Sequence, residues 1–119
     1  MIARIITIAN FRKEAKKLLK KFKSLKEELK ELSKELLVNP RKGTPIGKEI
    51  YKLRISVKSK GRGKRGGLRM ITYCIEESEE GQIEIYLLSI YDKSEYSTIS
   101  DKLLRQLIKE ILQNKKNSS

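Results

Sequence analysis

The spacing of apolar residues changes near residue 43, and this change divides the chain into a helical part and a mostly extended part. Before it, apolar residues recur every three or four positions, which predicts core-facing helices. Ser24 and Glu27 have the spacing of a capping box, so we expect a helical hairpin that breaks there. One long helix from 11 to 37 is the alternative, because no Gly or Pro interrupts the pattern. The apolar positions are Phe11, Ala15, Leu18, Leu19 and Phe22, then Leu25, Leu29, Leu32 and Leu36.

A short strand is expected before these helices. Residues 2–8 are rich in β-branched side chains, and Asn10 is a good N-cap for a helix that begins near Phe11. Asn39 and Pro40 are expected to end the second helix, because a residue that precedes proline disfavours the helical conformation.

After residue 43 the pattern indicates strands. Gly and Pro at 43–47 mark a loop, and residues 51–57 then alternate apolar and polar side chains. Two further strands are expected at 68–75 and 83–90. Because the connections between these strands are short, we expect antiparallel pairing.

A final helix is expected from the spacing of Leu and Ile between Leu103 and Leu112, with Thr98 or Ser100 as its cap. Residues 114–119 are expected to form a flexible tail. The order of elements predicts one α+β domain over residues 1–113, in which an N-terminal strand and a helical hairpin pack on a small antiparallel sheet with a C-terminal helix. We expect the helices to cover one face of the sheet and to leave the other face open.

Histidine is absent and Cys74 is the only cysteine, which restricts the chemistry that this chain can perform. A zinc site of the usual kind cannot be assembled, and we expect no metal or other cofactor. The apolar neighbours of Cys74 indicate a small core residue rather than a nucleophile. The acidic turn at 76–81 is interpreted as a solvated hairpin tip rather than a metal site. Any catalysis would therefore use Lys, Arg, Tyr or carboxylate side chains.

No apolar run approaches the roughly 18 residues of a membrane span. The N-terminus has no secretory leader, so we expect a cytoplasmic protein with no membrane partner.

Positive charge is concentrated in the middle of the chain. The formal net charge is +13, and residues 39–69 contain many Lys and Arg residues but only one acid, Glu49. Such a stripe is typical of a protein that binds nucleic acid, and a solvated basic face is the alternative. Glycines in the loop at 59–67 allow its cations to approach a phosphate chain closely. The cations expected to bind there are Lys58, Lys60, Arg62, Lys64 and Arg65.

Two segments resemble toxins of the RelE/HigB type. The first runs from Ile50 to Tyr73 and contains a Lys-x-Arg strand and a Gly-x-Gly-Lys-x-Gly-Gly-x-Arg turn. The second runs from Tyr86 to Glu95 and ends in Ile-Tyr-x-Lys-x-Glu. These pieces recur together, in this order, in the HigB-like branch of the RelE/ParE toxin superfamily. With the helical hairpin, the likeness covers residues from about 11 to 112.

The resemblance implies a RelE-like fold and a ribosome-dependent endonuclease that cuts translated mRNA without a metal, as the toxin of a type II toxin–antitoxin system. It implies three partners: the ribosome, mRNA, and a cognate antitoxin, commonly a helix-turn-helix protein of the HigA kind. The loop cations named above are then expected to bind RNA, with a plain exposed hairpin loop as the alternative. By position, the family's site residues correspond to Lys52, Arg54, Arg69 and Lys93, to which Tyr91 is added.

One position departs from the family's pattern. Some relatives use a further tyrosine in the chemistry, and Ile99 stands at that place in this chain. Tyr91 or Tyr96 would have to take over its role.

Cleavage of RNA by its own 2′-hydroxyl requires a base, an acid for the leaving oxygen, and stabilisation of charge on the phosphate. Lys52 is the candidate base, because neighbouring cations disfavour the charged form of an amine. Arg54 and Arg69 are expected to stay charged and to bind phosphate oxygens in a bidentate manner. Lys93 or Tyr91 is the candidate acid. The alternative is that Lys52 and Arg54 only solvate the polar face of a strand.

Two other functions remain open from the sequence. One is a non-catalytic toxin on the same fold, like the ParE-type relatives that inhibit DNA gyrase. The other is a basic RNA-binding protein without catalysis.

Overall fold

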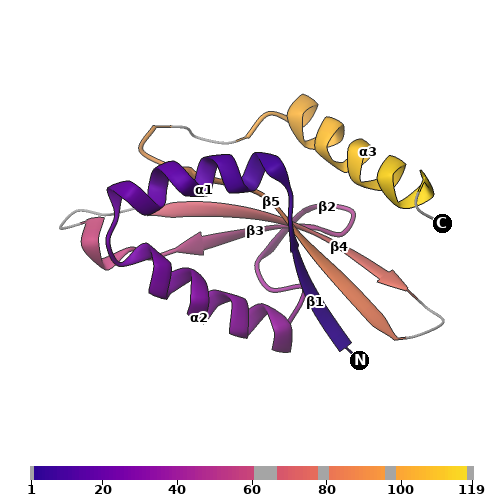
Figure 1. Cartoon of the computed structure of the whole chain (residues 1–119), viewed down its shortest axis with the longest axis horizontal. Coiled ribbons are helices and arrows are strands. Elements are labelled where there is room, and N and C mark those ends of the chain that lie inside the picture. The colour runs from indigo at the N-terminus through magenta and orange to yellow at the C-terminus, as the bar shows by residue number, and fades with distance from the viewer. Residues whose placement is uncertain (1, 61–66, 78–80, 96–98, 118–119) are drawn as a thin grey trace.

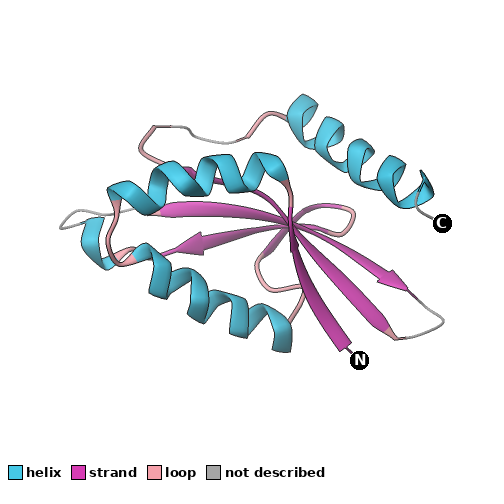
Figure 2. Cartoon of the chain, in the orientation of Figure 1, coloured by secondary structure: helices cyan, strands magenta, loops and turns pink. Residues whose placement is uncertain are grey.

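The computed structural model describes residues 2–60, 67–77, 81–95 and 99–117. Within them, three α-helices surround one five-stranded sheet (Figures 1 and 2). Its elements in chain order are β1 (Ile2–Thr7), α1 (Ala9–Lys21), α2 (Leu25–Val38), β2 (Thr44–Gly47), β3 (Ile50–Ile55), the short 3-10 helix η1 (Lys58–Lys60), β4 (Leu68–Glu77), β5 (Gln82–Asp92) and α3 (Asp101–Asn117). The α+β class expected from the sequence is confirmed.

The sheet is mixed rather than purely antiparallel, so that part of the expectation is wrong. The strand order is β1-β5-β4-β3-β2. β3, β4 and β5 pair antiparallel as expected, but β1 runs parallel to β5. Parallel pairing requires a long crossover, which α1, α2 and the following strands provide. The short pattern at residues 2–8 carries no information about the direction of a partner 80 residues away.

The segment expected to be a loop at 43–47 contains the edge strand β2. It pairs with the first half of β3, and all four of its residues are exposed. Proline is tolerated in edge strands and glycine weakens the strand pattern, so the sequence reads as a loop.

Helices cover both faces of the sheet, which corrects the expectation that one face is open. On one face, α1 and α2 pack on β3, β4 and β5 through residues that include Phe11, Leu36, Leu53 and Ile85. On the other face, α3 forms a separate cluster with β4 and β5, made by Leu104, Leu107, Ile111, Ile71, Tyr86, Leu88 and Tyr91. The continuous burial of β5 from Ile83 to Asp92 follows from this two-sided cover.

The helical hairpin is confirmed, but the capping box expected at its break is not formed. The Ser24 side chain does not cap α2; its hydroxyl donates to Glu28 Oε1 at 2.9 Å. Asn10 is also not an N-cap, because α1 begins at Ala9 and the Asn10 amide donates to the main-chain oxygen of Leu88 at 3.0 Å. The end of α2 at Val38, before Asn39 and Pro40, is as expected.

The last helix extends further than expected. Ser100 is its cap, since its Oγ accepts a hydrogen bond from the Leu103 N–H at 3.2 Å. α3 continues to Asn117, and Lys115 contacts the buried Glu84 at 2.6 Å, so the flexible tail expected from residue 114 is helical up to residue 117. None of the described helices is long and apolar enough to cross a membrane.

Cys74 is a core residue, as expected. It is 2% exposed, and its Sγ lies 3.2 Å from the main-chain oxygen of Pro40. Burial, reinforced by the charge of Glu49, raises the pKa of the thiol to about 11. The thiol is therefore protonated at neutral pH and is a poor nucleophile.

Candidate functional site

Three of the five predicted site residues form a row across adjacent strands. Arg54 on β3 lies directly opposite Arg69 on β4, and Arg69 lies directly opposite Tyr91 on β5. Directly opposed residues of antiparallel strands point to the same face, with Cβ atoms roughly 5 Å apart. We call Arg54, Arg69 and Tyr91 the cross-strand row. Residues separated by up to 37 positions in the sequence are thus brought side by side.

Lys52 lies on the same face of β3, two residues before Arg54. It is half-buried and opposes Ile71, which belongs to the cluster under α3. A two-residue step along a strand is about 6.5 Å, so Lys52 is the next neighbour of the row toward α3.

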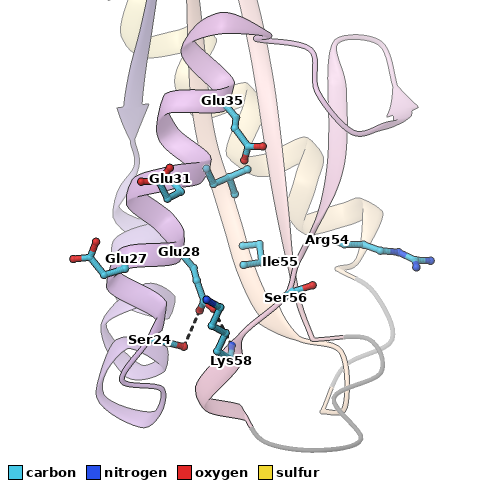
Figure 3. Close-up of a pocket in the computed structure, with 10 residues that line it drawn as sticks. Ser24, Glu27, Glu28, Glu31, Glu35, Arg54, Ile55, Ser56 and Lys58 are labelled. Carbon is cyan, nitrogen blue, oxygen red and sulfur yellow. Dashed lines mark hydrogen bonds between the residues drawn. The ribbon is translucent and has the colours of Figure 1, made fainter.

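The row lies on the sheet face away from α1 and α2. Leu53 and Ile55 alternate with Lys52 and Arg54 along β3, and both apolar side chains enter the core under α1 and α2. Figure 3 shows the Arg54 side chain extending away from α2. α3 covers Ile71 and Tyr91 on this face, but Arg54 is exposed. The guanidinium of Arg54 is therefore accessible to a large ligand.

Arg69 is the buried cation of the row. Its exposed fraction is 3%, and its Nη1 donates to the main-chain oxygen of Leu68 at 3.3 Å. Burial lowers the pKa of Arg69 from its ordinary value, and the positive charge of Arg54 lowers it further. Two guanidinium groups that repel each other at the end of β3 favour the binding of an anion between them.

Tyr91 places a phenol beside Arg69. Its side chain is 6% exposed, and among the described residues its hydroxyl has no hydrogen-bond partner. A buried hydroxyl without a partner costs about 1–3 kcal/mol, and because this oxygen is itself buried, a ligand oxygen reaches it only when neighbouring side chains move. The sequence alone did not indicate that Tyr91 would be buried.

Lys93 follows β5 and is exposed. Its main-chain N–H donates to Gly67 O at 3.2 Å, which places it at the same end of the sheet as Arg54 and Arg69. Gly67 has a positive φ of 46°, and a Cβ there would collide with the main-chain oxygen of Ile55. Glycine is thus required where β4 begins close against β3, two residues before Arg69.

The predicted loop cations do not all remain available for RNA. Lys58 is exposed, but the Lys60 ammonium lies 3.0 Å from Asp92 Oδ1, and the two side chains are 14% and 2% exposed. Burial alone raises the pKa of Asp92, but hydrogen bonds from Ser94 and Lys60 outweigh it and lower the pKa. Lys60 therefore has a structural partner. Arg62, Lys64 and Arg65 lie outside the described residues.

The start of this loop is fastened to α2. The Lys58 N–H donates to Glu28 Oε2 at 2.8 Å (Figure 3). The Ser59 N–H donates to Ser24 Oγ at 2.9 Å. In return, the Ser24 N–H donates to Ser59 Oγ at 3.0 Å. Together with the Lys60–Asp92 pair, these bonds hold η1 at the end of the sheet that carries the row. The capping-box spacing of Ser24 and Glu27 did not indicate these bonds, because their partners lie 30 and 35 residues away in the sequence.

No protein-family model matches this chain.

The sequence left Tyr91 and Tyr96 as candidates for the role of the tyrosine that Ile99 replaces. Ile99 is half-buried against the α3-side cluster and offers no polar group, and Tyr96 lies outside the described residues. Of the two candidate tyrosines, Tyr91 is the one that the described structure places next to a site cation.

The site combines a buried cation, an accessible cation and a phenol that has no partner in the part of the chain that the structure describes. Planar guanidinium groups bind phosphate oxygens in a bidentate manner, and a fixed donor needs little reorganisation when charge develops. The arrangement is suited to holding a phosphodiester on the exposed end of β3.

Proposed function

We propose that this protein is a metal-independent endoribonuclease of the RelE-like kind, which cuts translated mRNA on the ribosome as the toxin of a type II toxin–antitoxin pair. The observation that carries the proposal is the cross-strand row, in which Arg54, Arg69 and Tyr91 share one sheet face. Two arginines directly opposite each other destabilise a sheet, and the cost is offset when an anion binds between them.

The proposed chemistry assigns one task to each group. Arg54 and Arg69 bind the non-bridging oxygens of the scissile phosphate and stabilise the charge that develops there. Lys52 removes the proton of the 2′-hydroxyl, whose oxygen then bonds to the adjacent phosphorus. The bond from phosphorus to the 5′-oxygen breaks, and Tyr91 or Lys93 protonates that oxygen. The products are a 2′,3′-cyclic phosphate and a free 5′-hydroxyl.

The dependence on the ribosome and the helix-turn-helix antitoxin rest on the resemblance in the sequence, and the cytoplasmic location rests on the sequence pattern of the N-terminus. The net charge of +13 supports a polyanionic partner of either kind, ribosomal RNA or message.

A translation reaction reconstituted with purified protein tests the proposal. Primer extension on the message should reveal new 5′ ends within translated codons when wild-type protein is present. Arg54→Gln should reduce cleavage by about 100-fold, because one phosphate-binding guanidinium is lost. Arg105→Gln is the matched control, since Arg105 is an exposed arginine on α3. Message that stays intact on translating ribosomes with wild-type protein contradicts the proposal.

The same preparations distinguish the other functions left open by the sequence. A gyrase inhibitor blocks supercoiling in a purified gyrase assay while leaving the message intact. A simple RNA-binding protein does neither, and cells tolerate its expression.

A further inference from the structure

The outward face of α1 carries four lysines in one group. Lys13, Lys16, Lys17 and Lys20 are spaced as i, i+3, i+4 and i+7, so they are neighbours on one helix surface. All four are exposed, and among the described residues none of them forms an ion pair. We call them the α1 lysine ridge. The ridge is roughly 10 Å long, from the rise per residue of a helix.

The ridge points directly away from the core. Phe11 and Ala15 hold the opposite side of α1 against the sheet. The two remaining cations of the helix have partners, because Arg12 Nη1 donates to the main-chain oxygen of Thr7 at 2.6 Å and Lys21 lies 3.3 Å from Glu95.

The only acid in α1, Glu14, is turned inward and does not neutralise the ridge. Its Oε1 accepts hydrogen bonds from Ser89 Oγ at 2.8 Å and from the Ile90 N–H at 3.2 Å. These donors lie next to an irregularity in the pairing of β4 with β5, where Leu88 is the extra residue. Glu14 therefore binds the irregular part of β5 through hydrogen bonds.

The neighbouring helix shows the ordinary arrangement of a solvated surface. On α2, exposed lysines alternate with glutamates, as in the Lys34–Glu31 pair at 3.4 Å. Like charges three or four residues apart destabilise a helix, whereas Glu–Lys pairs stabilise it. Like charges also stand four residues apart on α2, but glutamates lie among its lysines, whereas the acid of α1 is turned inward.

We propose that the α1 lysine ridge is a second RNA-binding surface, which contacts the phosphate backbone independently of sequence. Four flexible ammonium groups act as point charges toward phosphates. No aromatic residue, arginine or amide lies on the ridge to read a base, so the contact is to the backbone. α1 covers the sheet face opposite to the cross-strand row, so the ridge and the row lie on different sides of the sheet. The ridge therefore binds a different RNA segment, and this binding does not depend on cleavage.

The test measures binding of the full chain to a 2′-O-methyl oligonucleotide, which has no free 2′-hydroxyl and is not cut by the proposed reaction. The ridge variant carries Lys13→Gln, Lys16→Gln, Lys17→Gln and Lys20→Gln. Its matched control carries the same change in net charge elsewhere, as Lys26→Gln, Lys30→Gln, Lys34→Gln and Lys109→Gln, all at exposed positions. Thermal unfolding checks that both variants are folded.

The ridge variant should bind the oligonucleotide at least about tenfold more weakly than the control at low salt. Its plot of log affinity against log salt should be shallower by about 3, since each lost contact to a single strand removes about 0.7. Equal affinity and equal slope in the two variants overturn the proposal. If RNA binding is equal but the ridge variant alone loses binding to polyglutamate, the proposal also fails, and the surface is assigned to an acidic protein.

Discussion

Arg54 and Arg69 oppose each other on adjacent strands, yet one is exposed and the other is 3% exposed. A buried guanidinium has lost most of its side-chain freedom before any ligand arrives, so it binds a phosphate with a smaller entropic cost than a free arginine does. Arg54 adds the accessible half of the site. In the proposed reaction, the two residues thus differ in task although they have the same chemistry.

The Tyr91→Phe variant distinguishes the effect of the Tyr91 hydroxyl on stability from its effect on cleavage. The variant removes a buried hydroxyl that has no partner among the described residues, so the free energy of unfolding should be unchanged or higher by about 1 kcal/mol. Cleavage should fall by roughly 10- to 100-fold if the phenol acts on the leaving oxygen. Urea unfolding and primer extension on the same preparation measure both effects. A clear loss of stability would show that the hydroxyl has a structural partner.

Lys60 was expected to bind RNA, but in the structure it pairs with Asp92. The Lys60→Gln variant tests this structural role. It leaves the buried carboxylate of Asp92 with the hydrogen bonds from Ser94 alone, so unfolding should become easier by about 1–3 kcal/mol. RNA affinity should change no more than for Lys30→Gln, an exposed lysine on α2. The converse result, weaker RNA binding with full stability, would return Lys60 to the RNA-binding set.

At the level of elements, the close approach of β4 to β3 at Gly67 positions the cross-strand row. Gly67→Ala forces a Cβ against the main-chain oxygen of Ile55 and strains a residue with positive φ. Gly81 also has a positive φ, but a Cβ there meets no atom within 4 Å. Gly81→Ala should cost about 1 kcal/mol and Gly67→Ala clearly more, with loss of cleavage. Chemical denaturation of both variants is the measurement, and equal costs would mean that the close approach is unimportant.

The end of α3 is attached to β5 by an ionic contact. Hydrogen bonding to Glu84 raises the pKa of Lys115 to about 12, and this contribution to stability is lost only as pH rises through that value. Burial alone raises the pKa of Glu84, but hydrogen bonds from Lys115, Arg4 and Tyr86 outweigh it and lower the pKa below its ordinary 4.5. The corresponding stability is present above that value and is lost as pH falls through the folded-state pKa.

Lys115→Met should therefore flatten the acid side of the stability curve. We expect a loss of about 1–3 kcal/mol at neutral pH, because Glu84 stays buried with one ionic partner fewer. The loss should shrink as pH falls below 4.5 and through the lowered folded-state pKa of Glu84, as Glu84 becomes protonated in both proteins. Lys109→Met, on the exposed side of α3, is the control. A loss that is constant with pH would mean that Lys115 acts through packing.

On the scale of the whole molecule, the sheet separates two cationic surfaces. The cross-strand row lies on the face that α3 partly covers, and the α1 lysine ridge lies outside the opposite face. Effects of changes at distant sites without shared partners add to within about 0.5 kcal/mol. Arg54→Gln combined with the ridge variant should therefore weaken ribosome binding by the sum of the two separate effects. Sedimentation with ribosomes measures this, and a combined variant no weaker than either parent would indicate one shared surface.

Local patterns in the sequence determined the helices, the three central strands and the class of the fold, because the period of an apolar stripe depends on a few neighbouring residues. They also placed Lys52 and Arg54 on one face of a strand, since side chains alternate. The direction of β1, the side of the sheet that α3 covers and the presence of β2 were decided only by tertiary structure. Each of these depends on contacts between segments distant in sequence.

For the candidate site too, the sequence determined one part and the tertiary structure decided the rest. Cationic residue types and their spacing were visible along the chain, and strand alternation placed them on a face. Only the register of β3, β4 and β5 set Arg54 against Arg69 and Arg69 against Tyr91. Only packing buried Arg69, turned Lys60 toward Asp92 and drew Glu14 away from the lysines of α1. Burial and pairing decide what a charge does, and both are properties of the assembled fold.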